Sequence, residues 1–396
     1  MLASPAIADW DPEPDYFFHW LRDSAIVMRN VAELMEDAEN ESERARWRRH
    51  FEDFVRFSLH LCALNGAASH DARPATRRGF RRFLRPRAEI LTLRGDKLLG
   101  EPRFNPDGSL DIFRWSRPQY DGPALRALAC LRYLAAGGAP SEDLQRLLHI
   151  DLDFTVRHAG KRCIGPWEEP RQKAHHYYVV LVQLAALLHG CDWAGGAIGE
   201  WTAVQVHLRA ALERFWSRRL QIIMAMRPAA ARSADERLDA SVLLGVWDAE
   251  LPDGPHSVAD RRVHQTQRAI ENLFARELPI NRRFGKRPML GRYRRDRYFG
   301  GGGWYPTTLA AAGLYYRRAQ RARTDAIALF KRGDALMQTV RDLTPVSGAL
   351  SEQVDRNAGP QTSARDLTWS YAAFVGAARA RQQALDHMHD AYGDKM

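Results

Sequence analysis

The chain has 396 residues, 45% hydrophobic and 27% charged, which is typical of a globular protein with enough apolar material for a large core. No apolar run approaches the roughly 18 residues of a membrane span, and no N-terminal stretch resembles a secretory signal, so we expect neither. The four cysteines form no CxxC pair, which argues against a zinc or redox motif. We expect them to be reduced, as in a cytoplasmic protein.

The net charge is +10, and arginine supplies most of it. The densest basic runs lie at residues 73–87 and 282–297. A basic patch can bind nucleic acid, but neither run interleaves aromatic residues and acids are spread through the rest of the chain. We therefore interpret both runs as solvated basic faces and expect no nucleic-acid partner. The alternative, nucleic-acid binding, would show a steeply salt-dependent affinity.

Helical periodicity dominates the chain. Apolar residues in 47–62 and again in 208–223 are spaced to fall on one face of a helix. Further helices are expected over residues 23–36, 123–136, 141–150, 172–190, 258–275, 305–320, 324–341 and 363–388. Strand signals are few: residues 89–93 and the turn at 104–108 predict a small β-hairpin within residues 85–115. No low-complexity linker divides the chain, so residues 1–396 are expected to form one all-α domain.

Polar or charged clusters stand directly before six helices that are rich in small and apolar residues. The clusters are Arg22-Asp23, Asp121-Gly122-Pro123, Trp167-Glu168-Glu169, Asp239, Gly300 to Trp304, and Glu352 with Ser363 to Asp366. Pro123 suits a first helical turn, and Ser363 with Asp366 predicts a capping box. Because amphipathic helices alternate with these six, we predict an (α/α)6 barrel, a double ring of helices with all six clusters at one mouth.

The paired acids Glu168 and Glu169 lie in a short loop fenced by prolines, which fix the backbone. Acids before a helix are also explained by the helix dipole alone. Hydrolysis of a glycosidic bond, however, needs one protonated carboxyl and one ionised carboxylate. Either acid of the pair could be the protonated carboxyl. The proximity of the two acids would raise the pKa of one of them, whereas the helix N-terminus would lower it. Glu352 is the best second carboxylate, although taken alone it also fits a plain loop acid.

Aromatic and charged residues occur together in four separate loops, as a sugar site requires. They are Tyr16, Trp20, Arg22 and Asp23; Trp115 and Arg117; Trp167; and Arg292, Trp304 and Tyr305. Core packing is the usual role of any single Trp. Gly300 to Gly303 lack the Lys and preceding strand of a phosphate loop, and His175-His176 lack further metal ligands. We expect no cofactor and no metal.

Five segments resemble the signature segments of glycoside hydrolase family 15, the glucoamylases and their bacterial relatives. They are residues 16–25 (YFFHWLRDSA), 115–127 (WSRPQYDGPALRA), 167–169 (WEE), 291–293 with Asp296 and 303–305 (GRY and GWY), and 351–353 with 363–373 (SEQ and SARDLTWSYAA). They stand in family order and cover the chain from about residue 15 to 375.

The resemblance implies an (α/α)6 barrel and inverting release of glucose from the non-reducing ends of α-linked glucans. It places Glu168 as general acid and Glu352 as general base. It also implies substrate-binding roles for Tyr16, Arg22, Asp23, Trp115, Trp167, Glu169, Arg292, Trp304 and Gln353, with Tyr16 and Gln353 near the attacking water. Inversion would place the two carboxyls roughly 6.5–9.5 Å apart, leaving room for that water.

The sequence departs from the family pattern around the site. We expect neither the N-terminal β-sandwich domain of many bacterial members nor a starch-binding module. Tyr120, Gly301 to Gly303 and Pro170 replace residues common in glucoamylases. The linkage, α-1,4, α-1,6 or that of trehalose, therefore stays open, as do chain length, pH optimum and oligomeric state. The alternatives are a trehalase-like hydrolase and a non-catalytic sugar-binding or regulatory (α/α)6 protein.

Overall fold

The computed structural model describes residues 1–5, 16–68, 78–169, 173–196, 198–227, 237–322 and 324–392. Contacts between Cα atoms divide the chain into two units, which are described in turn. Unit 1 comprises Met1–Ala3 and Phe17–Leu208, and unit 2 comprises Ser4–Tyr16 and Arg209–Met396. The prediction of one domain stays a prediction.

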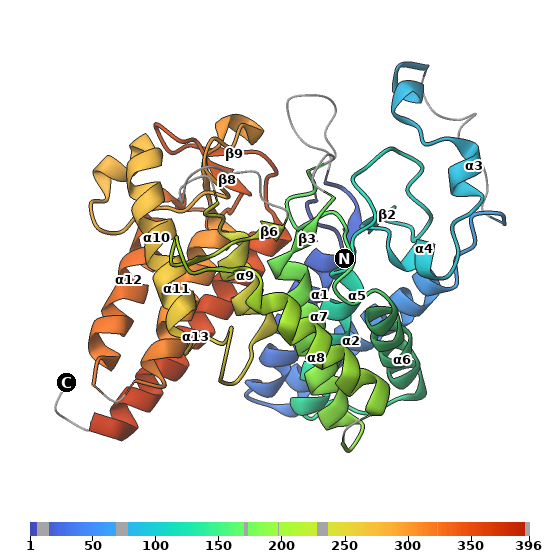
Figure 1. Cartoon of the computed structure of the whole chain (residues 1–396), viewed down its shortest axis with the longest axis horizontal. Helices are drawn as coiled ribbons and strands as arrows, with labels where there is room; N and C mark the ends of the chain where they lie inside the picture. The colour runs from blue at the N-terminus through green and yellow to red at the C-terminus, as the bar shows by residue number, and fades with distance from the viewer. Residues whose placement is uncertain are drawn as a thin grey trace. The chain divides into compact units, whose positions relative to one another are not determined.

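Unit 1 is built around three helices that are buried along nearly their whole length (Figure 1): α1 (Leu21–Glu36), α5 (Gly122–Ala135) and α7 (Tyr177–Trp193). Helix α5 packs against both α1 and α7. The amphipathic helices α2 (Glu41–Cys62) and α6 (Glu142–Arg157) cover them. A helix that is apolar on all sides needs such a cover, because every face must be removed from water. Helix α8 (Gly199–Glu213) crosses the boundary to unit 2.

Unit 2 repeats this arrangement. Helix α11 (Tyr305–Ala319) is almost wholly buried and packs against α9 (Ser241–Ala249), α12 (Ala326–Leu343) and α13 (Thr368–Tyr392), as Figure 1 shows for α11, α12 and α13. Helix α10 (Arg261–Glu277) packs against α9. The six helices predicted to follow polar clusters are thus all present, as α1, α5, α7, α9, α11 and α13. No described helix has both the length and the apolar composition needed to cross a membrane.

The described strands are two residues long. In unit 1, β1 (His19–Trp20) pairs antiparallel with β2 (Arg103–Phe104). In unit 2, β4 (Trp216–Ser217) pairs with β5 (Ile222–Ile223), and β7 (Gly303–Trp304), β8 (Gln353–Val354) and β9 (Gln361–Thr362) form one antiparallel sheet. Two further strands are β3 (His175–His176) and β6 (Met226–Arg227). Three of the strands, β1, β3 and β7, run directly into the helices α1, α7 and α11.

The predicted hairpin region is only partly correct. The turn is confirmed, because Gly108 N–H donates to the Asn105 carbonyl at 3.0 Å and Phe104 bridges Leu110. The strand expected at residues 89–93 is wrong. That stretch begins with α3 (Arg87–Ile90) and is followed by α4 (Asp96–Leu99). Ile90 and Leu93, three residues apart, both enter the core, which is helical rather than strand spacing.

The helix expected over residues 208–223 lies earlier in the chain than predicted, at Gly199–Glu213. Helix α8 ends at Glu213, and the apolar residues beyond it belong to β4 and β5, with Trp216 opposite Ile223. Gln221, at φ +54°, turns the chain between the strands. Short apolar runs fit either periodicity, so their spacing could not distinguish the two.

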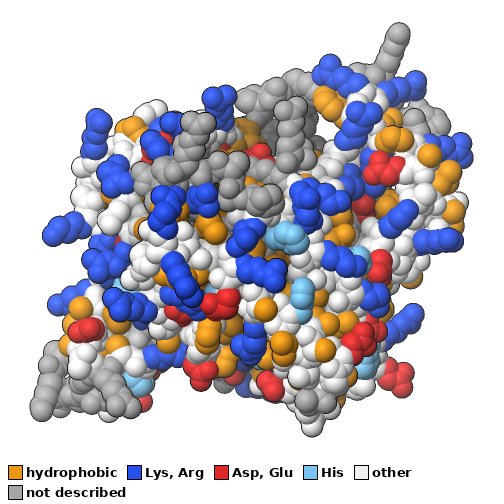
Figure 2. Space-filling view, viewed as in Figure 1, with side chains coloured by type: hydrophobic (Ala, Val, Ile, Leu, Met, Phe, Trp, Pro, Cys, Tyr) orange, Lys and Arg blue, Asp and Glu red, His pale blue; other side chains and the backbone are white. Residues whose placement is uncertain are grey.

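The basic runs are not uniformly solvated. Figure 2 shows Lys and Arg side chains spread over the visible face with acidic side chains among them. Arg85 and Arg292, one from each run, are only 2% and 3% exposed and are paired with Glu101 and Asp296. The expectation of solvated faces is therefore wrong at these positions, where arginine serves buried ion pairs. Residues 73–77 of the first run lie outside the described residues.

Candidate active site

The carboxyl group of Glu168 accepts hydrogen bonds from four side chains of unit 1. Its Oε1 atom accepts from Trp20 Nε1 at 3.0 Å, Arg22 Nη2 at 2.9 Å and Gln119 Nε2 at 2.9 Å. Its Oε2 atom accepts from the indole N–H of Trp115. The Glu168 side chain is 14% exposed. The carboxyl is thus held rigidly, with Oε1 occupied by three donors and Oε2 by one.

Arg22 is positioned by the first turn of α1 and the residues before α5. Its Nη1 donates to Asp121 Oδ2 at 2.7 Å and to Gln119 Oε1 at 3.1 Å. Gly122 allows this approach, because a Cβ there would lie 2.9 Å from the Leu21 Cβ. Pro123 occupies the first turn of α5, as predicted.

The backbone of Glu168 adopts a left-handed conformation, with φ +58°. Its N–H donates to the Gly165 carbonyl at 3.0 Å and closes a tight turn. Residue 165 must be glycine here, since a Cβ would lie 2.4 Å from His176 Nδ1. Trp167 and Glu169 flank Glu168 and are half-buried, whereas Pro170 lies outside the described residues. Backbone strain of this kind gathers at functional sites.

Asp23 follows Arg22 in α1, and its Oδ2 lies 4.0 Å from Arg22 Nε. Burial raises its pKa to about 7, against the opposing effect of Arg22 and with a further rise from the Glu168 charge. Between about pH 4 and pH 7 the folded protein therefore holds a proton that the unfolded chain releases. Stability contributed by this group falls as pH rises through that window, by about 4 kcal/mol in total.

Asp23→Asn tests this assignment, because the amide cannot ionise. The free energies of unfolding of Asp23→Asn and of the unmodified protein are measured by urea denaturation from pH 4 to pH 8. The difference between them, variant minus unmodified protein, is expected to rise with pH up to about pH 7 and to stay constant above it. Parallel curves for the two proteins would show that Asp23 does not titrate in this window.

Glu352 is the centre of a second cluster, in unit 2. It is 4% exposed and precedes β8. Its Oε2 accepts from the Ser363 hydroxyl, and its Oε1 accepts from Tyr16 Oη at 3.4 Å. Tyr16 Oη also lies 2.7 Å from Tyr298 Oη. Burial, with the Glu352 charge, raises the pKa of Tyr298 above its usual range, so this phenol stays protonated.

Arg292, Trp304 and Gln353 lie near Glu352 in the same unit. Arg292 donates to both Asp296 oxygens, at 2.7 and 2.6 Å, and its Cζ lies 5.1 Å from the Trp304 ring centre and 5.0 Å from that of Tyr298. Trp304 is the strand partner of Gln353. The Gln353 side chain is fully buried, and neither its Nε2 nor its Oε1 has a hydrogen-bond partner among the described residues.

The predicted capping box at Ser363 and Asp366 is wrong. Helix α13 begins at Thr368, beyond both residues. Ser363 instead donates to Glu352, while Asp366 accepts from Tyr371 Oη at 2.6 Å. Both have positive φ, +67° and +46°, which no helical turn permits.

The structure thus gathers the predicted site residues into two clusters. Unit 1 brings together Arg22, Asp23, Trp115 and Glu168, with Trp167 and Glu169 beside Glu168; unit 2 brings together Tyr16, Arg292, Trp304, Glu352 and Gln353. The prediction gave no role in positioning the two carboxyls to Trp20, Gln119 or Asp121 in the first cluster, or to Ser363 and Tyr298 in the second; Trp20 was expected only as an aromatic residue of a sugar site. All but Tyr298 lie in segments that carry the family resemblance, and that context could have identified them. No group of three or more metal-ligating side chains occurs among the residues that could be searched.

The structure is a helical domain with a buried carboxyl cluster in each unit, and comparison with known proteins identifies the family. The sequence profile of glycosyl hydrolases family 15 matches residues 91–379, well over half of the chain. The chain therefore belongs to glycosyl hydrolase family 15, as the sequence predicted. Membership confirms the expected class of enzyme, a glycoside hydrolase, at the level of the family.

Individual relatives support the same family assignment. The chain is 26% identical to a glucoamylase of Blastobotrys adeninivorans, with 94% of this chain and 66% of the relative aligned, and 26% identical to Glucoamylase-1 of Schizophyllum commune, with 97% and 69% aligned. It thus spans about two thirds of these relatives. The solved glucoamylase of Saccharomycopsis fibuligera has a TM-score of 0.80 at 23% identity, covering 97% of this chain and 89% of that one. This likeness confirms the predicted (α/α)6 fold class.

Proposed function

We propose that the protein is an inverting, exo-acting α-glucoside hydrolase that releases β-glucose from the non-reducing ends of α-linked gluco-oligosaccharides. Glu168 is the general acid and Glu352 the general base. The observation that supports this best is the carboxyl of Glu168, fixed by two indoles, an amide and an arginine in a chain of family 15. Positioned carboxyls of this kind are what acid catalysis requires.

The hydrogen bonds assign the proton of Glu168 to one oxygen. Oε1 already accepts three donors, so a proton there would displace at least one of them. Oε2 accepts only the Trp115 indole and has room for a hydrogen aimed at the glycosidic oxygen. We therefore propose that Oε2 carries the proton given to the leaving group.

Glu352 has the partners that a general base needs. Ser363 and Tyr16 orient its carboxylate by donating to its two oxygens. In the proposed step, Glu352 takes a proton from water as the water oxygen attacks the anomeric carbon. Glu168 gives its proton to the departing sugar oxygen as the glycosidic bond breaks. Arg22, Asp23, Arg292 and the aromatic residues Trp115, Trp167 and Trp304 would bind the sugar, with Glu169, Tyr16 and Gln353 beside them.

The reaction is tested by measuring glucose release from maltose, isomaltose, trehalose, kojibiose, starch and dextran. Turnover of at least one short α-glucoside is expected, and the rates will define the linkage. Preferential cleavage of trehalose would favour a trehalase-like enzyme. Oligosaccharide binding, measured by calorimetry, with no turnover on any substrate would favour a non-catalytic sugar-binding protein and overturn the proposal. A cytoplasmic location stays a prediction.

A further inference from the structure

The guanidinium group of Arg103 lies among three aromatic rings in unit 1. Its Cζ atom is 3.8 Å from the ring centre of Trp115, 4.0 Å from that of Phe18 and 5.1 Å from that of Trp20. The backbone places it there, because Arg103 of β2 is the strand partner of Trp20 in β1. A cation against an aromatic face is attracted to it, more strongly where water is excluded, and Arg103 is only 4% exposed.

Two of these rings are the indoles that donate to Glu168. Trp20 donates to Oε1 and Trp115 to Oε2, and their rings meet edge to face at 5.9 Å. The tilt of each indole decides where its N–H points. Arg103 touches both rings, and its contact with Trp115, the partner of Oε2, is the closest of the three. Arg103 itself makes no described hydrogen bond to Glu168.

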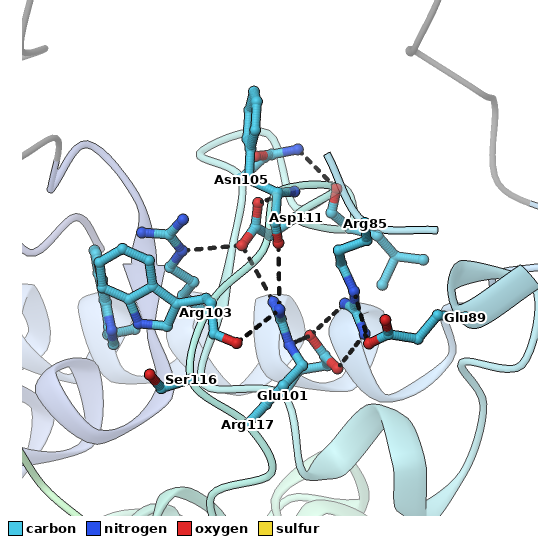
Figure 3. A network of polar contacts seen from close by, with 12 residues as sticks. Arg85, Glu89, Glu101, Arg103, Asn105, Asp111, Ser116 and Arg117 are labelled. Carbon is cyan, nitrogen blue, oxygen red and sulfur yellow. Dashed lines mark hydrogen bonds and ion pairs between the residues drawn. The ribbon is translucent and has the colours of Figure 1, made fainter. Parts of the chain in front are cut away.

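Arg103 is held in turn by a buried network of ion pairs, shown in Figure 3. Its Nε donates to Asp111 Oδ2 at 3.0 Å, and Arg117 Nη2 reaches the same oxygen at 3.3 Å. Arg117 Nε then donates to Glu101 Oε2 at 2.8 Å, and Arg85 Nη1 does so at 2.8 Å as well. Asp111 and Glu101 are 2% and 4% exposed.

A buried network of this size is a weak source of stability, because desolvation offsets much of the attraction between its charges. What it does supply is fixed geometry. Asp111, Arg117 and Glu101 each have two or more charged partners, and Arg103 is held by Asp111 on one side and by the three rings on the other, so its guanidinium has little freedom to rotate. The network ends at the rings that orient the Glu168 carboxyl, which is where fixed geometry matters for proton transfer.

We propose that Arg103 is a positioning residue for the proton-donating oxygen of Glu168, acting through the Trp115 and Trp20 indoles. The inference rests on the proposed function of Glu168. It assigns to Asp111, which Arg117 also contacts, the role of fixing Arg103, whereas Arg85 lies further along the network and pairs with Glu89 and Glu101. Loss of Arg103 would let the indoles tilt and would impair proton donation without removing the acid or the base.

The test compares two substrates that differ in their need for an acid. Maltose needs a proton on its leaving oxygen. In α-glucosyl fluoride the attacking water gives its proton to the base, the C–O bond forms, and fluoride leaves with the C–F electrons without prior protonation. A defect confined to proton donation therefore lowers kcat on maltose and spares the fluoride.

Arg103→Met, close in length and uncharged, is expected to lower kcat on maltose by about 10- to 100-fold, with KM changed by less than about 3-fold and fluoride hydrolysis nearly unchanged. Arg103→Lys should shift the ratio of the two rates in the same direction, since lysine keeps a charge for Asp111 but lacks the flat face that stacks on Trp115. This milder variant serves if Arg103→Met does not fold, which thermal unfolding will show.

Arg85→Met is the matched control. Arg85 is a buried arginine of the same network, 2% exposed, but none of the three rings is among its described contacts. It should leave the maltose-to-fluoride ratio near that of the unmodified protein, even if it lowers stability. A ratio unchanged in folded Arg103 variants, or changed equally in Arg85→Met, would overturn the proposal. Failure of the unmodified protein to hydrolyse either substrate would instead overturn the proposed function.

Discussion

Glu168→Gln is expected to lower kcat for glucose release from maltose by about 10²- to 10⁴-fold, because the amide has no proton to donate to the leaving oxygen. The substitution is nearly isosteric. Arg22 and Trp20 can still donate to the amide oxygen at the Oε1 position, and only Trp115 loses its acceptor, so the fold should persist. Hydrolysis of α-glucosyl fluoride should survive, since fluoride departs without protonation. Initial rates on the two substrates, with the melting temperature as a check on folding, measure all three effects.

Glu169→Gln is the matched control for this substitution. It changes the neighbouring carboxylate in the same loop, to which the proposal gives a role in binding sugar. We expect a raised KM and a much smaller loss in kcat. If Glu169→Gln proves as inactive as Glu168→Gln, or if Glu168→Gln keeps full activity on maltose, the general acid has been assigned to the wrong residue.

Glu352→Gln is expected to impair hydrolysis of both substrates, unlike Glu168→Gln. The base activates water for both substrates, so hydrolysis of maltose and of α-glucosyl fluoride should each fall by about 10²- to 10⁴-fold. Ser363→Ala provides the graded comparison, because it removes only the hydroxyl that holds one oxygen of Glu352. We expect it to lose roughly 5-fold on both substrates, as one net hydrogen bond of about 1 kcal/mol would give.

Glu168→Gln and Glu352→Gln together separate the roles of the two carboxyls. Selective loss on maltose marks the acid, and parallel loss on both substrates marks the base. Selective loss in Glu352→Gln, with fluoride hydrolysis intact, would contradict its assignment as the base. The comparison needs no assumption about the natural substrate beyond an α-glucosyl group.

Much of the helical framework was predictable because its signals are local. The stretch that forms α7 is apolar on all sides, and α5 starts at the predicted glycine and proline. The failures occurred where apolar runs were too short to show a period, as at residues 89–93 and beyond Glu213. Tertiary contacts decided those segments: Ile90 and Leu93 join a core with Leu98, Phe104 and Leu110.

The sequence allowed the main site residues to be predicted, but not the contacts between them. The motifs identified Glu168 and Glu352, but no local pattern shows that Trp20 and Arg22, about 150 positions earlier, meet the Oε1 atom of Glu168. Ser363 was misassigned because its spacing to Asp366 fits a capping box. Its left-handed backbone, which sequence patterns do not reveal, turns the hydroxyl to Glu352 instead. The contacts of Arg103 were not predictable either, because Phe18 and Trp20 are far from it in the sequence and meet it only through the pairing of β1 with β2.

The central proposal is that Glu168 and Glu352 carry out an inverting hydrolysis, and the configuration of the first product tests it most directly. Proton NMR of maltose or another cleaved α-glucoside, recorded before mutarotation, should show β-glucose as the initial product. Water delivered by a base to the face opposite the leaving group can give only that anomer. An initial α-anomer would show retention and would contradict the roles given to both carboxyls.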